Sequence, residues 1–262
     1  VFKPFVASVA IENNISPLYE CTGNIQIGNT YFKCSNHTPH GKVSMNSALR
    51  LSCNTYFIAL GQTLGAEKLI SLSSDFGLGK SVELADNFYL KSGKLPTAES
   101  INSPPSLANL SFGQGELLAS PLQMAVAYSV FANGGFYRAP TLMKAIIDED
   151  GNTIQKVNLP QKYRILNEDT ARRIDEILED VVTNGNGNKA YSFITSNRGK
   201  TATAQSGWYK NGREINHTWF CGYFMANNKT YVVAIFKEDG ISGATDCAPV
   251  FKELSENIVR LG

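Results

Sequence analysis

The sequence has no long apolar run, no excess of one charge and no basic cluster. Its 24 Lys and Arg residues balance 23 Asp and Glu residues, which leaves a net charge of +1. That balance argues against a nucleic-acid partner and against a mainly electrostatic attachment to membranes. A membrane-spanning helix needs about 18 or more consecutive apolar residues, and these 262 residues contain no such run. With 43% hydrophobic residues, the sequence predicts a globular protein with a sizeable core.

Histidine is scarce, and its three positions follow no pattern of metal ligands. His37, His40 and His217 have no common spacing, and the sequence contains no Cys-x-x-Cys pair. We therefore expect no metal site and no cofactor, and we interpret His40-Gly41 as a turn. Gly113-Gln114-Gly115 is not a phosphate loop, because no strand precedes it and no Lys follows it.

The five cysteines are an odd number, so at least one must be unpaired within a monomer. Cys21 and Cys34 flank a short stretch with Gly and Asn that could close as a disulfide loop in an oxidising compartment. Such a loop would contribute about 3 kcal/mol on the chain-entropy model. Two free thiols are the alternative, and the sequence leaves both open. Cys53, Cys221 and Cys247 lie in apolar patterns and are predicted to be small core residues.

Hydrophobic periodicity predicts mainly helices in the first half of the chain and antiparallel strands later. The predicted helices are Phe2 to Asn14, Ser44 to Leu64 (one helix or two consecutive ones), Ala66 to Phe76, Leu122 to Phe131, Asn167 to Val182 and Ala248 to Leu261. The predicted strands are a hairpin within Pro140 to Val157, then His217 to Phe224 and Tyr231 to Phe236. Cys21 to Lys42 and Ser81 to Leu110 are expected to be loops or irregular structure. This order predicts an α+β fold in one domain, residues 1–262.

Three short segments carry reactive side chains. Lys200-Thr201-Ala202-Thr203 precedes the two late strands, Ser52-Cys53-Asn54 has the form Ser-x-Asn, and Val1-Phe2-Lys3 opens the sequence. Acyl transfer through a serine needs a nucleophile, a base and donors for the oxyanion. In a helical Ser-x-x-Lys motif the two side chains share one face, within hydrogen-bond reach. Lys3 would be the lysine of such a motif if a serine directly preceded Val1, and we expect that serine.

Further segments extend the pattern along the chain: His40-Gly41, Ala48 to Phe57, Phe112 to Gly115, Ser120 to Ala125, Ala132 to Gly135 and Gly199-Lys200-Thr201. Together with the three motifs, they resemble the transpeptidase domain of a class B penicillin-binding protein, nearly from end to end. The resemblance implies an antiparallel sheet flanked by helices, with a helical region and with N-terminal strands that precede this sequence. It also implies cross-linking of peptidoglycan stem peptides through an acyl-serine, which β-lactams acylate in place of the substrate.

The resemblance assigns catalytic roles to four residues. Lys3 would be the general base of acylation, and Ser52 would bridge Lys3 and Lys200 and pass a proton toward the leaving group. Lys200 would supply positive charge. The backbone N–H of Thr203 would be one oxyanion donor, and the N–H of the expected serine would be the other.

Substrate-binding roles follow in the same way. Asn54 would hold the amide of the substrate, and the hydroxyls of Thr201 and Thr203 would bind its terminal carboxylate. The family has Gly where this chain has Ala202, so the resemblance does not extend to that position. Trp208 and Tyr209 are expected either to line the substrate groove or to be ordinary loop aromatics.

Two other functions compete with transpeptidation. A serine β-lactamase or a β-lactam sensor shares the fold, but no Glu stands in an obvious loop motif for activating water. A non-catalytic module that binds cell-wall peptides or division partners is favoured by Ala202 and by the lack of the serine within these residues. The resemblance implies stem peptides, β-lactams and cell-wall synthesis or division proteins as partners. It places the domain on the extracytoplasmic face of a bacterial membrane, anchored by a segment outside this sequence.

Overall fold

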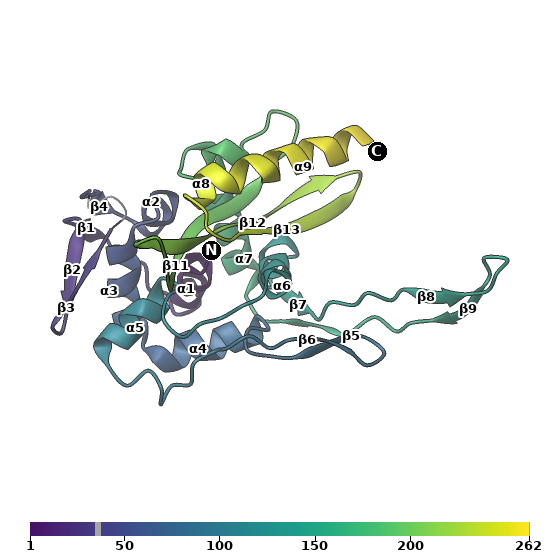
Figure 1. Cartoon of the computed structure of the whole chain (residues 1–262), viewed down its shortest axis with the longest axis horizontal. Coiled ribbons are helices and arrows are strands. Elements are labelled where there is room, and N and C mark those ends of the chain that lie inside the picture. Colours follow the sequence, from purple (N-terminus) through teal and green to yellow (C-terminus); the bar gives the residue numbers. More distant parts are fainter. Residues whose placement is uncertain (35–37, 262) are drawn as a thin grey trace.

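The computed structural model describes residues 1–34 and 38–261, and its centre is a three-stranded antiparallel sheet (Figure 1). The sheet has the order β11-β12-β13, with β11 at Arg198–Lys210, β12 at Arg213–Ala226 and β13 at Lys229–Lys237. Helices α8 (Gly243–Asp246) and α9 (Ala248–Leu261) pack on one face, and α6 (Pro121–Ala132) and α7 (Glu168–Thr183) contact the sheet from the other side. The predicted α+β class, with a sheet flanked by helices, is confirmed.

Side chains of β12 alternate between two cores, as expected for a strand covered on both faces. Phe220 and Phe224 lie in the core under α9, where both rings contact Phe251. Cys221 and Tyr223 lie in the larger core on the other side. This sandwich holds β11, the edge strand next to β12, at the boundary between the sheet and the helical region.

The helical region surrounds α1 (Lys3–Glu12), whose residues from Lys3 to Ile11 are all buried. A helix that is apolar on every side belongs in the middle of a bundle, and α1 contacts α2 (Met45–Arg50), α3 (Asn54–Leu64), α4 (Ala66–Asp75) and α7. Figure 1 shows α1 directly below β11, with α3, α4 and α5 (Pro104–Ser111) beyond it. The N-terminus of α1 therefore meets the sheet edge.

The segment from Ser44 to Leu64, left open as one helix or two, forms two helices. After α2, the N–H of Ser52 bonds to the carbonyl of Leu49, and the N–H of Cys53 bonds to the carbonyl of Ala48. These two bonds make a Schellman turn, and Ser52 takes the left-handed position with φ +57°. Because glycine usually occupies that position, Ser52 does not mark a helix end, and the sequence could not decide between one helix and two.

The prediction of a loop over Cys21 to Lys42 was wrong. The described part of this segment and its edges form short strands: β1 (Tyr19–Cys21), β2 (Asn24–Ile27), β3 (Thr30–Lys33) and β4 (Gly41–Val43). β2 pairs with β3 as a hairpin, and β1 pairs with β4. Gly23, Gly28 and Asn29, which suggested a loop, lie in the bends and turns between strands of three or four residues. Strands of that length are too short to show a clear alternation.

The prediction of irregular structure over Ser81 to Leu110 was also wrong in part. The segment contains the hairpin β5–β6 (Val82–Ala85 and Phe88–Leu90) and most of α5. Ser103 caps α5 by accepting a hydrogen bond from the N–H of Ser106, and two prolines open the helix, where their missing N–H groups leave no bond unmade. Pro104 and Pro105, two of the residues that suggested irregularity, thus begin a helix.

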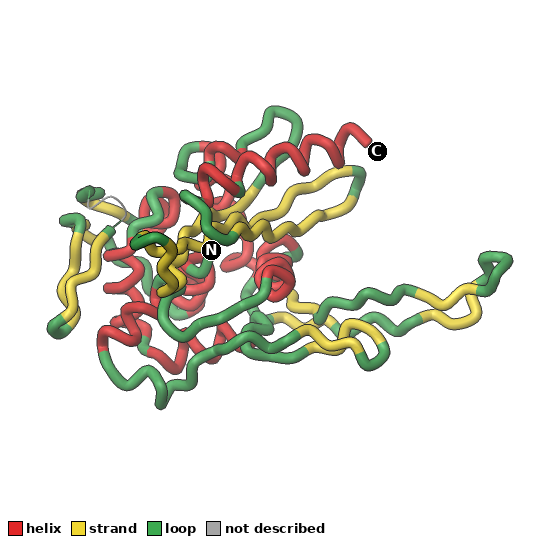
Figure 2. Tube along the Cα trace, viewed as in Figure 1, coloured by secondary structure: helices red, strands yellow, loops and turns green. Residues whose placement is uncertain are grey.

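The remaining predicted elements are confirmed, with small shifts at their ends. The hairpin β8–β9 (Ala145–Ile147 and Thr153–Lys156) projects away from the body of the molecule, beyond the pair β7 (Phe136–Arg138) and β10 (Lys162–Arg164) (Figure 2). Ser120 caps α6 with a capping box to Gln123, as the Ser-Pro sequence predicts. Asn167 precedes α7, but its side chain bonds to Glu12 rather than capping the helix. Among the described residues, no helix is long and apolar enough to cross a membrane.

Candidate active site

Lys3 lies at the N-terminus of α1, with its ammonium group aimed at the turn between α2 and α3. Its Nζ donates hydrogen bonds to the Ser52 carbonyl at 2.7 Å, to Ser52 Oγ at 3.0 Å and to Asn54 Oδ1 at 2.6 Å. Three acceptors match the three hydrogens of an ammonium group. The Phe57 ring lies 5.9 Å from the same Nζ.

Lys200 reaches the same turn from β11 and is fully buried. Its Nζ donates to Ser52 Oγ at 3.0 Å, to the carbonyl of Thr201 at 3.1 Å and to Asn186 Oδ1 at 3.4 Å. The predicted meeting of Lys3, Ser52 and Lys200 is therefore present, and the Ser52 hydroxyl lies between the two amines. The left-handed conformation of Ser52, which costs a residue other than glycine about 1–2 kcal/mol, places its hydroxyl and its carbonyl within reach of Lys3.

The protonated forms of Lys3 and Lys200 are both disfavoured in this site. Burial lowers the pKa of Lys3 to about 8, although the neighbouring sulfurs of Cys53 and Cys34 act in the opposite direction. Burial, and then the charge of Lys3, hold the pKa of Lys200 well below its usual value. Desolvation penalises a charged amine, and a second amine nearby adds to the penalty. The site therefore disfavours the state in which Lys3 and Lys200 are both protonated.

Asn186 is a site residue that the sequence interpretation missed. It lies in the Asn-Gly turn after α7, which reads as a helix stop, and its Oδ1 accepts hydrogen bonds from Lys200 Nζ and, at 3.3 Å, from Thr201 Oγ1. Its backbone N–H bonds to the carbonyl of Arg50, the last residue of α2. Asn186 thus ties the strand that carries Lys200 to the helix that leads into Ser52.

The other predicted site residues lie along two short paths from this centre. Asn54 begins α3, and its Nδ2 donates to the carbonyl of Lys33 at 3.0 Å. Thr201 is buried beside Lys200, whereas Thr203, two residues further along β11, is exposed and pairs across the ladder with Thr218. Ala202 is half-buried between them. The exposed part of β11 is a sheet edge, where alternate backbone groups have no strand partner.

The start of the chain lies inside the same region. Tyr128 Oη donates to the carbonyl of Val1 at 2.8 Å. Gly113 approaches closely: a Cβ at this position would lie 2.5 Å from Phe2 Cβ. Trp208 and Tyr209, predicted as groove or loop aromatics, are exposed and lie within β11.

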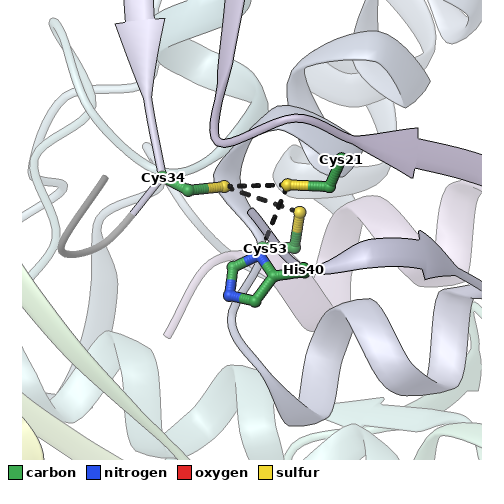
Figure 3. Close-up of side chains that lie close together, drawn as sticks. All are labelled: Cys21, Cys34, His40 and Cys53. Carbon is green, nitrogen blue, oxygen red and sulfur yellow. Dashed lines mark hydrogen bonds between the residues drawn. The ribbon is translucent and has the colours of Figure 1, made fainter. Parts of the chain in front are cut away.

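A second cluster lies directly behind the Ser52 turn. The sulfurs of Cys21 and Cys34, the pair left open as a disulfide, are 3.6 Å apart and not bonded. Cys34 Sγ is also 3.6 Å from Cys53 Sγ, and His40 Nδ1 is 3.4 Å from Cys21 Sγ. Figure 3 shows the three sulfurs and the His40 ring converging from separate elements. Of the other histidines, His217 lies in β12 and His37 is outside the described residues.

The comparisons with known proteins agree with this geometry. The family model for the penicillin binding protein transpeptidase domain matches residues 1–256. Stage V sporulation protein D of Bacillus subtilis is 31% identical over 236 residues, which cover 87% of this chain and 36% of that protein. Peptidoglycan D,D-transpeptidase MrdA of Haemophilus influenzae is 27% identical, over 97% of this chain and 43% of that protein. The chain therefore spans less than half the length of these curated relatives.

Two solved structures show the same fold. The D,D-transpeptidase domain of a peptidoglycan glycosyltransferase from Eggerthella lenta aligns with a TM-score of 0.85 and 29% identity, over 100% of this chain and 64% of that one. Penicillin binding protein 3 of Mycobacterium tuberculosis, solved with aztreonam, aligns with a TM-score of 0.86 and 26% identity, over 99% of this chain and 61% of that one. With nearly every described element inside the matched range, this chain belongs to the penicillin binding protein transpeptidase domain family.

Proposed function

We propose that residues 1–262 form the transpeptidase domain of a peptidoglycan D,D-transpeptidase, truncated on its N-terminal side. The observation that carries the proposal is the position of Ser52 Oγ, 3.0 Å from both Lys3 Nζ and Lys200 Nζ. A hydroxyl between two buried amines of lowered pKa is a relay for protons. Relatives named as D,D-transpeptidases support the reaction class.

The nucleophile in this proposal is a serine bonded to the nitrogen of Val1. Val1 is half-buried, its carbonyl accepts a hydrogen bond from Tyr128, and it lies two residues before Lys3. A side chain attached to its nitrogen would therefore lie near the Lys3 amine. One helical turn would separate this serine from Lys3, which brings the two side chains onto one face of α1.

Acylation then begins with Lys3 as the general base. Neutral Lys3 takes the proton of the serine hydroxyl while its oxygen attacks the carbonyl carbon of the penultimate D-Ala. The C–N bond to the terminal D-Ala breaks, and its nitrogen takes a proton that Ser52 relays from the lysine pair. The product is an acyl-serine ester, and an amine from a second stem peptide later attacks this ester and releases the serine.

Substrate binding is assigned to Asn54 and to the edge of β11. Asn54 lies half-buried at the start of α3, where its amide can pair with the backbone of the stem peptide. The hydroxyls of Thr201 and Thr203 would bind the terminal carboxylate, which requires Thr201 to exchange its bond to Asn186 for the substrate. The N–H of Thr203 is proposed as an oxyanion donor, and losing one such donor typically costs about 3 kcal/mol of transition-state stabilisation.

β-Lactams are the second class of ligand in this proposal. A β-lactam presents a strained amide in place of D-Ala-D-Ala, and its ring nitrogen stays attached after the bond opens, so the acyl-enzyme persists. The aztreonam and ampicillin complexes of a structural relative support this assignment. We place the domain on the extracytoplasmic face of a bacterial membrane, anchored by a segment outside this sequence. Any cell-wall synthesis or division partners would contact segments outside this sequence as well.

The deciding experiment is a covalent adduct with labelled penicillin, formed by the full-length protein and located by mass spectrometry. A single adduct on the residue before Val1 is expected. Hydrolysis of nitrocefin with many turnovers would instead identify a β-lactamase, and a stable adduct without transpeptidation of stem-peptide donors would identify a sensor. No adduct in a folded protein would identify a non-catalytic binding module.

A further inference from the structure

Four potential metal ligands meet behind the candidate active site, although they are scattered over 33 positions of the sequence. Cys21 ends β1, Cys34 follows β3, His40 precedes β4, and Cys53 lies between α2 and α3. Their ligand atoms all lie within 4.8 Å of one another. The three cysteines are buried, and His40 is half-buried (Figure 3). The pairing of Cys21 with Gly41 across β1 and β4 brings His40 to the first sulfur.

The separations match those of ligands around one tetrahedral zinc ion. With Zn–S near 2.3 Å and Zn–N near 2.0–2.1 Å, tetrahedral geometry separates two sulfurs by about 3.8 Å and a sulfur from a nitrogen by about 3.6 Å. The observed sulfur pairs are 3.6 Å apart, Cys21 with Cys34 and Cys34 with Cys53, and Cys21 Sγ lies 3.4 Å from His40 Nδ1. The longest separations between ligand atoms, up to 4.8 Å, would have to shorten by about 1 Å for all four atoms to bind one ion.

A disulfide explains these contacts less well than a metal ion. A disulfide has its sulfurs about 2.05 Å apart and joins two of them. It would leave the third cysteine and the imidazole in the same small volume without a role. The Cys21–Cys34 and Cys34–Cys53 sulfur pairs share Cys34 and are equal in length, so neither pair is favoured as a disulfide.

The hydroxyl of Thr55 lies beside all three sulfurs, where it can donate a hydrogen bond to a zinc-bound thiolate. Thr55 Oγ1 is buried and donates to Cys21 Sγ at 3.2 Å. It also lies 3.3 Å from Cys53 Sγ and 3.5 Å from Cys34 Sγ. Outer hydrogen bonds of this kind hold the ligands in place and tune a metal site.

We propose that Cys21, Cys34, Cys53 and His40 bind one structural Zn²⁺ ion, through three thiolates and the Nδ1 of a neutral imidazole. Four protein ligands leave no open position, which is the pattern of structural rather than catalytic zinc. Binding releases the three thiol protons to solvent and leaves a net charge of −1 on the site.

The ion would fasten the Ser52 turn to the small strands. Cys53 is the middle residue of Ser52-Cys53-Asn54, and the side chain of Asn54 already bonds to Lys33, next to Cys34. Zinc would therefore cross-link the two chain segments on either side of this bond. Because the ion binds the folded state, its binding energy adds to the stability of the domain.

The first test needs no variant. The protein, expressed with zinc and purified under reducing conditions, should contain about one zinc per chain by elemental analysis. Removing it with a chelator should lower the thermal unfolding midpoint, and adding Zn²⁺ should restore it. Loading the metal-free protein with Co²⁺ should give the visible bands of a tetrahedral, thiolate-rich site.

Variants locate the site. His40→Asn keeps the three sulfurs and sits at a half-buried position, so the fold should persist. Loss of one outer partner alone typically weakens metal affinity about 10–100-fold, and loss of the ligand His40 should weaken it at least as much. Cys34→Ser should lose zinc. Cys247→Ser is the matched control, because Cys247 is equally buried, lies 3.6 Å from a threonine hydroxyl, and is outside the cluster; it should keep a full complement of zinc.

Metal content and acylation are separate readouts, so this inference stands or falls apart from the proposed function. Reduced wild-type protein that binds neither Zn²⁺ nor Co²⁺ would overturn it. Protein that is purified with a disulfide between two of the three cysteines, and that takes up no zinc after this disulfide is reduced, would also overturn it. Full zinc retention in both His40→Asn and Cys34→Ser would overturn it as well.

Discussion

Lys3 and Lys200 direct their ammonium groups at one hydroxyl: each Nζ lies 3.0 Å from Ser52 Oγ. The two lysines come from α1 and β11, elements that are far apart in the sequence and lie next to each other only in the fold. Each finds two further acceptors on its own side of Ser52. The pair therefore forms a continuous hydrogen-bonded path from the start of the chain to the sheet edge, and the predictions below test it.

Lys3→Ala or Lys200→Ala should leave the fold intact and slow acylation by a β-lactam. Both side chains are assigned to chemistry, and losing a positioned general base typically costs about 10²–10⁴-fold in rate. Acylation rate constants from labelled penicillin would measure the loss, with circular dichroism as the check on folding. Lys229→Ala, at an exposed position in β13, is the control and should acylate at the wild-type rate. A near-normal rate in either test variant would remove that lysine from the mechanism.

The acylation rate should rise with pH around 8. Lys3 acts as a base only when neutral, and its pKa is lowered to about 8. Roughly one Lys3 in ten is then neutral at pH 7 and half at pH 8, so the rate should increase about fivefold over that unit and level off above pH 9. The second-order rate constant measured from pH 6 to 9.5 gives the profile. A flat profile, or a rate that falls as pH rises through 8, would contradict the assignment of Lys3 as the base.

Ser52→Gly and Ser52→Ala should separate stability from activity. Both remove the hydroxyl between the lysines, so both should lose acylation. They differ in the backbone, because φ +57° suits glycine and strains alanine. The glycine variant should therefore be more stable than the alanine variant by about 1 kcal/mol in the free energy of unfolding. Urea unfolding measures the difference, and an alanine variant of equal or greater stability would show that the left-handed turn is not retained.

Gly61→Ala should destabilise the helical region. Gly61 lies in α3 where α5 crosses it, and a Cβ there would lie 1.8 Å from Ser111 Oγ and 2.5 Å from Ser111 Cβ. Overpacking of this kind typically costs about 1–3 kcal/mol, against a gain of about 1 kcal/mol in helix propensity. Ser111→Gly in the same chain should restore part of the loss, because it removes both contacting atoms. Thermal unfolding of the single and double variants completes the cycle, and purely additive effects would rule out the contact.

Ala202→Gly should leave penicillin acylation equal or faster. Ala202 lies between Lys200 and Thr203 on β11, and an alternating strand turns its methyl to the same side as Lys200. Glycine is favoured where a backbone must approach closely, and an extra methyl in a packed site typically costs about 1–3 kcal/mol. The acylation rate constant is the measurement. A drop of tenfold or more in a folded protein would mean that the methyl is needed and that this geometry is wrong.

The residues of the site that could be predicted are those that stand in short motifs with a recognisable order along the chain. Lys3, Ser52 and Lys200 were identified from short motifs in the right order, and the structure brings all three together. Asn186 could not be found in this way, because Asn beside Gly also marks an ordinary helix end. Its role depends on a contact with Lys200 in β11, a strand that comes later in the chain.

The cysteine cluster could not be predicted for a different reason. The spacings between Cys21, Cys34, His40 and Cys53 follow no regular ligand pattern, since strand pairing and a Schellman turn set the geometry. The same strands are too short to show a period of two. Longer elements such as α7 and α9 were found from the sequence, because over 14 to 16 residues their apolar faces repeat clearly.

The bond between Lys200 and Ser52 closes a gap of 148 residues along the chain. In folding terms this is a contact of very long range, and such contacts form only after a large loss of chain entropy. Elements near Ser52 in the sequence can assemble first, but the two-lysine path is complete only when β11 packs against α7 and brings Lys200 to Ser52. A newly made chain would therefore complete the path between Lys3, Ser52 and Lys200 only when it is almost fully folded.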